Sequence, residues 1–260
     1  MKRILFIILC FLPLSAKPSD STVVSPREII HTKWYSSVEH IDRRVDIYIP
    51  AAYDTCSRPL PVVMLIHGIN GYEGSWQERA HVADTLEKMI AQGRCEPMIL
   101  VMPDCNKWPF KERPITKGNL WKALTHYGKL SREHELEQAV SNLIDLIDST
   151  YAVSSYSIAG LSDGGRIAAN VAILRPDKIR YVGLFSPVLH KEQVPRDTTI
   201  QFTIITGQID IFFASGDRFR RRLKHAHCPH QLIALENGGH NWRTWRKCFP
   251  MFLELKEQPK

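Results

Sequence analysis

The sequence predicts an α/β fold built on a mainly parallel sheet, and three observations indicate it. Short apolar runs alternate along the chain with amphipathic helical segments, as in successive strand–helix–strand units. Most of these runs are continuously apolar, as strands covered on both faces require. The chain has 260 residues, of which 44% are hydrophobic, so its composition suits a large core and excludes disordered or fibrous proteins.

Residues 1–16 are expected to form a secretory signal peptide. Lys2 and Arg3 give a basic start, an apolar stretch runs to Leu14, and small residues precede a cleavage site after Ala16. The apolar stretch is too short to cross a bilayer comfortably, which disfavours the alternative of an N-terminal membrane anchor. We therefore expect no stable membrane span and a mature chain that is secreted or periplasmic.

The rest of the chain is divided into a leader and first strand region over residues 17–40 and a single α/β domain over residues 41–260. Within 44–49, apolar and polar residues alternate with a period of two, which is typical of a half-buried antiparallel strand. Strands are expected at 34–38, 44–49, 61–66, 97–102, 156–159, 182–185, 202–205 and 232–235. Helices are expected at 80–91, 135–147, 166–174 and 244–255, the last interrupted near Pro250.

One long connection, residues 106–129, holds four aromatic residues among basic ones. Connections of this length are often functional, so we expect a lid or a substrate-contacting excursion, with a structural packing loop as the alternative. The densest basic run, residues 218–224, is expected to be the solvated face of a helix. Attraction to an anionic polymer is the functional alternative. The net charge of +7 does not by itself indicate a nucleic-acid partner, and none is expected.

The mature chain keeps five cysteines, so at least one stays unpaired if export allows disulfides. Cys95 and Cys105 flank a predicted strand and are expected to lie too far apart to bond each other. Cys56 with Cys95 and Cys228 with Cys248 remain open as pairs. No cysteine pair has the spacing of a zinc site, so no metal is expected.

The segment Gly-Leu-Ser-Asp-Gly at 160–164 lies between a short apolar strand and a helix. In that setting the serine occupies a sharp strand-to-helix turn, with its hydroxyl exposed above the sheet. Ser162 is therefore the candidate nucleophile, and the backbone N–H of Asp163 is a candidate oxyanion donor. A plain glycine-rich turn is the alternative interpretation.

Two further segments supply what a serine nucleophile needs. His240 follows a glycine pair after the last predicted strand and is the candidate base. Asp210 follows the strand at 202–205 and is the candidate carboxylate that orients the base, with Asp217 in reserve. Ile69, in the loop that begins His67-Gly68, is expected to donate the second oxyanion N–H, while His67 is expected to shape that loop.

Together these segments resemble the esterase D-type branch of the α/β-hydrolases, which includes feruloyl esterases and S-formylglutathione hydrolases. The resemblance runs from about Ile41 to the end of the chain. It is carried by Arg-Val-Asp-Ile-Tyr-Ile-Pro at 44–50, by the motifs around His67, Ser162, Asp210 and His240, and by Trp245. It implies an α/β-hydrolase fold and the chain order nucleophile, acid, base. Many relatives have methionine after the nucleophile, where this chain has Asp163, with Arg166 as the candidate partner for its carboxylate.

The resemblance implies a secreted serine carboxylesterase that forms a covalent acyl-enzyme and needs no cofactor. Its expected partner is a small-molecule or polysaccharide ester, such as a feruloyl or acetyl ester of a polysaccharide. Trp76, Trp108 and Trp242 are candidate substrate contacts. The alternatives are a catalytically weak or inactive hydrolase-fold binding protein and a relative of the serine peptidases. The sequence predicts no oligomeric state.

Overall fold

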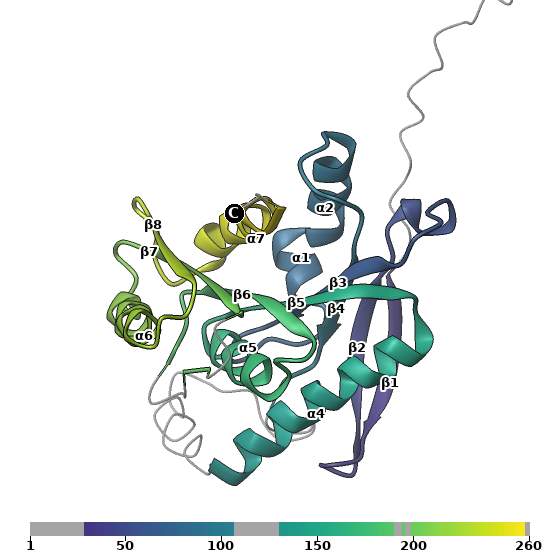
Figure 1. The fold of residues 1–260 in the computed structure, drawn as a ribbon, viewed down its shortest axis with the longest axis horizontal. Helices are drawn as coiled ribbons and strands as arrows, with labels where there is room; N and C mark the ends of the chain where they lie inside the picture. The colour runs from purple at the N-terminus through teal and green to yellow at the C-terminus, as the bar shows by residue number, and fades with distance from the viewer. Residues whose placement is uncertain (1–28, 107–129, 190–193, 196–198, 258–260) are drawn as a thin grey trace, which may run out of the picture.

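The computed structural model of the chain describes residues 29–106, 130–189, 194–195 and 199–257. Within these ranges the centre of the molecule is an eight-stranded sheet with the order β1-β2-β4-β3-β5-β6-β7-β8 (Figure 1). The expected signal peptide and the aromatic connection at 107–129, with Trp108, lie outside the described residues.

The strand pairing matches the predicted mainly parallel sheet. β1 pairs antiparallel with β2, β2 pairs antiparallel with β4, and every other neighbouring pair is parallel. β1, which lies in the expected leader region, pairs with β2 along its whole length. The strands are β1 Ile30–Ser36, β2 Ile41–Tyr48, β3 Leu60–Ile66, β4 Ile99–Pro103, β5 Val153–Leu161, β6 Ile179–Phe185, β7 Gln201–Gly207 and β8 His230–Leu235.

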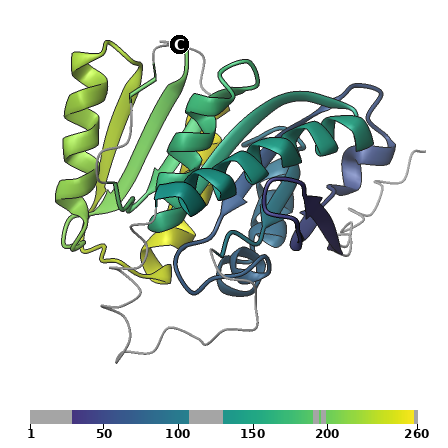
Figure 2. The ribbon, with the colours of Figure 1, turned by 90° about the horizontal axis from the view of Figure 1, so that it is seen from below.

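Helices cover both faces of the sheet (Figure 1). α1, α2 and α7 contribute to the core on one face, and α4, α5 and α6 to the core on the other. Turned by 90°, the molecule shows α6 beside β7 and β8 at one end and β1 near the other (Figure 2). The helices are the 3-10 turn Ala51–Asp54, α1 Ser75–Ala80, α2 Val82–Ala91, α4 Leu130–Thr150, α5 Asp163–Leu174, α6 Phe213–His225 and α7 Trp242–Glu257.

The continuous apolar run of β3 is explained by these two cores. Val62, Met64 and Ile66 pack on the α4–α5–α6 side, whereas Val63 and Leu65 pack on the side of α1, α2 and α7. Since successive side chains of a strand point to opposite faces, a strand buried on both faces has to be apolar throughout.

Two helices differ from the sequence prediction. The helix expected at 80–91 is divided at His81, whose φ of 48° is left-handed and ends α1 before α2 begins. The expected interruption near Pro250 does not occur, because α7 continues through that residue. Phe249 and Phe252 are buried on either side of Pro250, and their packing holds the helix on the sheet despite the missing N–H.

The two cysteine pairings left open by the sequence do not form, and no disulfide joins any of the cysteines in the described part of the chain. Cys56 and Cys228 pack with the core on the α4–α5–α6 face of the sheet. Cys95 and Cys248 belong to the core on the opposite face. A disulfide needs Cα atoms within about 7 Å of each other, which the intervening sheet prevents.

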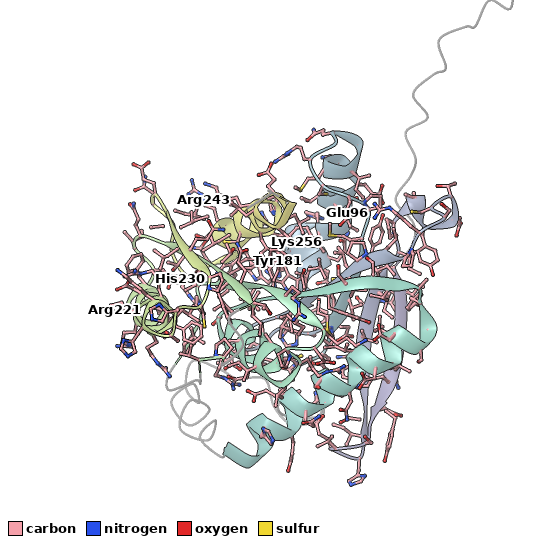
Figure 3. The ribbon with its side chains drawn as sticks, in the orientation of Figure 1. Glu96, Tyr181, Arg221, His230, Arg243 and Lys256 are labelled. Atoms are coloured by element: carbon pink, nitrogen blue, oxygen red, sulfur yellow. The ribbon has the colours of Figure 1, made fainter. Side chains whose placement is uncertain are left out.

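The basic run falls on α6, as the helical interpretation expects. Phe219 and Leu223 are buried against the sheet, while Arg218, Arg221 and Arg222 are exposed. Arg221 lies on the outer side of the helix, away from the sheet (Figure 3). Attraction of this face to an anionic polymer remains a prediction. Among the described helices, none is long and apolar enough to cross a membrane.

Candidate active site

The candidate residues gather at the carboxyl ends of neighbouring parallel strands. Ser162 follows β5, Asp210 follows β7 and His240 follows β8, while the loop that begins at His67 follows β3. β3, β5, β6, β7 and β8 are consecutive in the sheet. Open α/β sheets bind their ligands at this edge.

Ser162 occupies a strained turn between β5 and α5. Its φ of 54° and ψ of −120° are unusual for a residue with a side chain. Its N–H donates to the Phe185 carbonyl at 2.9 Å, and its own carbonyl accepts from the N–H groups of Gly165 and Val188. Such strain persists only where the surroundings enforce it, and it is typical of functional positions.

Two glycines make this turn sterically feasible. A Cβ on Gly160 would lie 2.1 Å from the Gly164 carbonyl oxygen, and one on Gly164 would lie 2.3 Å from the His67 carbonyl oxygen. No side chain fits at either distance. The glycines of the motif are therefore needed because β5, α5 and the β3 loop approach each other through their backbones.

The three side chains form one hydrogen-bonded chain. The distance from Ser162 Oγ to His240 Nε2 is 2.9 Å, and His240 Nδ1 lies 3.1 Å from both carboxylate oxygens of Asp210. When Nδ1 carries the ring proton and donates a hydrogen bond to Asp210, Nε2 is unprotonated and can accept the serine proton. This is the arrangement by which a histidine activates a serine hydroxyl.

The loops that carry Asp210 and His240 are joined through their backbones. Gly207, at the end of β7, passes so close to Gly238 that a Cβ on it would lie 2.0 Å from the Gly238 oxygen. The Ile209 N–H donates to that same oxygen at 3.0 Å. Gly238, two residues before His240, thus brings the loop of the candidate base to the loop of the candidate acid.

Asp210 is held as a carboxylate by its neighbours. Burial acts to raise its pKa, but hydrogen bonds with His240 and from the Phe212 N–H, together with the nearby Ser186 hydroxyl, lower the pKa below its ordinary value. The Phe212 N–H donates to Asp210 Oδ1 at 2.8 Å. An ionised Asp210 is the form that orients the ring of His240 and stabilises it when it is protonated.

Aromatic rings hold the imidazole of His240 in place. Phe212 and Trp245 contact it edge-on, with ring centroids 4.8 Å and 5.0 Å away. Trp242 packs on Trp245, and Trp76 packs on Trp242. Trp242 is partly exposed, but Trp76 is fully buried, so its surface is taken up by protein neighbours and it supports the site from beneath.

The β3 loop lies directly beside the nucleophile. A Cβ on Gly68 would come within 3.1 Å of the Ser162 Cβ, and Ile69 is the next residue of this loop. The buried ring of His67 accepts the Cys105 N–H at Nε2, at 2.8 Å, and its Nδ1 lies 2.8 Å from the Gly68 carbonyl. His67 therefore connects this loop to the end of β4.

The carboxylate of Asp163 is turned toward Arg166. The distance from Arg166 Nε to Asp163 Oδ1 is 2.8 Å, which confirms Arg166 as the partner predicted from the sequence. The same guanidinium donates through Nη1 to Glu137 of α4 at 2.7 Å, and the Asn170 amide donates to the same Glu137 oxygen.

Two apolar side chains stand in solvent on either side of Asp210. Ile209 is 71% exposed and Ile211 is 79% exposed. Large apolar side chains with this exposure, on the loop that carries the candidate carboxylate, form an apolar rim beside the candidate site. Across the described ranges, no group of three or more His, Cys, Asp or Glu side chains is arranged to hold a metal ion.

Several supporting residues were not predicted. Ser186, which is fully buried with a φ of 47°, helps to lower the pKa of Asp210 but lies after a plain strand with no motif. Glu137 contacts Arg166, which is 29 residues away in the sequence. Asn106 contacts Gly71, which is 35 residues away. Phe212 could have been suspected as a supporting residue from the sequence, because it lies only two residues after Asp210 in the same loop.

Comparisons with known proteins place the chain in a family. A family model described as putative esterase matches residues 36–244. An endo-1,4-beta-xylanase/feruloyl esterase of Xylanibacter ruminicola is 25% identical over 226 residues, which are 84% of this chain and 29% of the relative. The chain thus spans less than a third of the length of that curated relative.

Solved structures share the fold at low sequence identity. A ferulic acid esterase of Anaeromyces mucronatus has a TM-score of 0.73 and 20% identity, covering 91% of this chain and 92% of its own. An S-formylglutathione hydrolase of Staphylococcus aureus has a TM-score of 0.65 and 14% identity, covering 88% and 98%. The fold is therefore that of the α/β-hydrolases, and the chain belongs to the putative esterase family.

Proposed function

We propose that this chain is an exported serine esterase whose reaction passes through an acyl-enzyme on Ser162. The observation that carries the proposal is the hydrogen-bonded chain from Ser162 through His240 to Asp210, with 2.9 Å and 3.1 Å contacts, at a strained serine. The proposal of export rests on the sequence of residues 1–16. Sequencing the N-terminus of the mature protein tests it, and the expected first residue is Lys17.

In the proposed mechanism, Ser162 Oγ attacks the ester carbonyl while His240 Nε2 takes the serine proton. The backbone N–H groups of Ile69 and Asp163 donate to the oxyanion of the tetrahedral intermediate. His240 then returns the proton to the leaving alcohol, and Asp210 stabilises the imidazolium between these steps. Water, deprotonated by His240, attacks the acyl-enzyme and releases the acid and the free serine.

The proposed substrate is an ester with an apolar or aromatic acyl group, as in a feruloyl ester on a polysaccharide. Ile209 and Ile211 support this, because they form an exposed apolar rim at the acid side of the triad. The Xylanibacter relative is named a feruloyl esterase, and one solved neighbour is described in complex with ferulic acid. Trp242, partly exposed beside Trp245, is a further candidate contact.

The test is hydrolysis of p-nitrophenyl acetate by the mature chain beside Ser162→Ala, followed by feruloyl and longer acyl esters. We expect the rate of the variant to fall by a factor of about 10⁴ or more, with the thermal unfolding temperature preserved. An unchanged rate in Ser162→Ala would contradict the proposed nucleophile. Activity on acetyl but not on feruloyl esters would contradict the proposed acyl group and leave the nucleophile in place.

A further inference from the structure

The residue after the nucleophile carries a negative charge close to the place where the proposed mechanism develops another. Asp163 is the first residue of α5, and its backbone N–H is a proposed oxyanion donor. A carboxylate in the first turn of a helix interacts with the same positive helix end that would stabilise the oxyanion. Two negative charges that share this helix end also repel each other, and the repulsion is strong where water is scarce.

Arg166 is placed to offset that charge. Its Nε lies 2.8 Å from Asp163 Oδ1, and it lies one turn along α5. The side chain of Arg166 is 4% exposed and that of Asp163 is 15% exposed. An ion pair with this burial is screened by salt much less than a surface pair.

A second element fixes the guanidinium. Arg166 Nη1 lies 2.7 Å from Glu137 Oε1 on α4, and the Glu137 side chain is 8% exposed. Asn170, one turn further along α5, donates to the same oxygen at 2.7 Å. The guanidinium therefore sits between two helices, and the Asp163 carboxylate is held on the flank of α5 that faces α4.

We propose that Arg166 is a positioning residue of the ester hydrolysis, which neutralises the Asp163 carboxylate and holds it on the α4 side of α5 while the Asp163 N–H binds the oxyanion. The inference rests on the proposed function, since it requires an oxyanion at Ser162. Glu137 contacts the same guanidinium from α4, a helix that carries neither proposed oxyanion donor, and so provides a matched comparison.

The experiment measures kcat and KM for p-nitrophenyl acetate in Arg166→Met and in two double variants, D163N/R166M and E137Q/R166M. Each double variant lacks the guanidinium and one of its two carboxylates. We expect Arg166→Met to lower kcat roughly tenfold or more with little change in KM, less than the loss from removing an oxyanion donor outright. D163N/R166M is expected to recover most of that kcat, whereas E137Q/R166M is expected to stay low.

Equal kcat values in the two double variants would overturn the proposal, since a purely structural role of Arg166 predicts similar rescue from either carboxylate. Arg166→Lys serves as the second variant if the double variants do not fold, because it keeps the charge. It is expected to retain more of the wild-type kcat than Arg166→Met, and equal losses would overturn the proposal. A wild-type enzyme without ester hydrolysis would contradict the proposed function instead.

Discussion

The two loops that meet at Ser162 are held by different kinds of contact. The turn at Ser162 is fixed by backbone hydrogen bonds to β6 and by the close approach of Gly164 to His67. The β3 loop is fixed by contacts of side chains, both its own and those of neighbouring strands and loops. His67 bonds the Cys105 N–H, the Asn106 amide donates to the Gly71 carbonyl at 2.6 Å, and Arg44 of β2 pairs with Glu73 at 3.0 Å.

Because their contacts differ, the two loops should be sensitive to different kinds of substitution. The turn at Ser162 should tolerate changes in side-chain chemistry but not the addition of any side chain at its glycines. The β3 loop should respond to truncation of its own His67 and of side chains that lie far from it in sequence. Both loops carry a proposed oxyanion donor, so catalysis should depend on both kinds of contact.

The largest effect is expected from Gly164→Ala. Its Cβ would meet the His67 carbonyl at 2.3 Å, a contact that only a backbone shift can relieve. We expect the free energy of unfolding to fall by about 3 kcal/mol or more and the ester hydrolysis to be lost. Urea denaturation and p-nitrophenyl acetate hydrolysis measure the two effects.

Gly93→Ala is the matched control for this variant. Gly93 has a φ of 66° but open space around the position of a Cβ. Only backbone strain is expected there, at about 1 kcal/mol, with activity retained. Similar losses in the two variants would show that the turn at Ser162 is not held by backbone contact as described.

An intermediate effect is expected from His67→Ala, which tests the side-chain support of the β3 loop. The buried Cys105 N–H would lose its acceptor, at a cost of about 1–3 kcal/mol in unfolding free energy. We also expect kcat to fall, because Ile69 would no longer be held beside Ser162. His134→Ala, on the exposed side of α4, is the control. An unchanged kcat in a destabilised His67→Ala would contradict the expectation that this support of the loop is needed for catalysis.

The smallest effect is expected from Asp104→Asn and depends on pH. Burial acts to raise the pKa of Asp104, but the hydrogen bond from the Asn106 N–H and the nearby charge of Arg43 help to hold the pKa below its ordinary value. A lowered pKa stabilises the fold above the unfolded pKa of about 3.9, and this contribution is lost as the pH falls through the folded pKa. The variant should therefore be less stable by on the order of 1 kcal/mol at pH 7.

The corresponding measurement is urea denaturation of both proteins between pH 7 and pH 3. Their difference in unfolding free energy should be constant down to about pH 5 and should shrink below about pH 4. A difference that grows toward low pH would contradict the lowered pKa of Asp104.

Much of the fold followed from local patterns in the sequence. Continuous apolar runs predicted β3 and β4 because strands buried on both faces have no polar positions. The residues of the proposed triad could be selected from the sequence because each lies in a motif directly after a strand. The parallel sheet then brings those strand ends together, to the distances of 2.9 Å and 3.1 Å in the structure.

What the sequence did not predict depends on contacts across the sheet or between distant segments. The cysteine pairings failed because each of the two candidate pairs is divided by the sheet, which no local pattern reveals. The break at His81 depends on one left-handed residue in a segment with helical periodicity. In the sequence, Glu137 is an ordinary polar position of a predicted helix, because its partner Arg166 lies 29 residues further along the chain.

The central claim, that Ser162 is the nucleophile activated by His240, is tested most directly by peptide mapping after treatment with a fluorophosphonate. We expect one adduct on the peptide that contains Ser162 in the wild-type protein, much slower labelling in His240→Ala, and none in Ser162→Ala. Labelling at another residue, or ester hydrolysis that persists in Ser162→Ala without an adduct, would contradict the account.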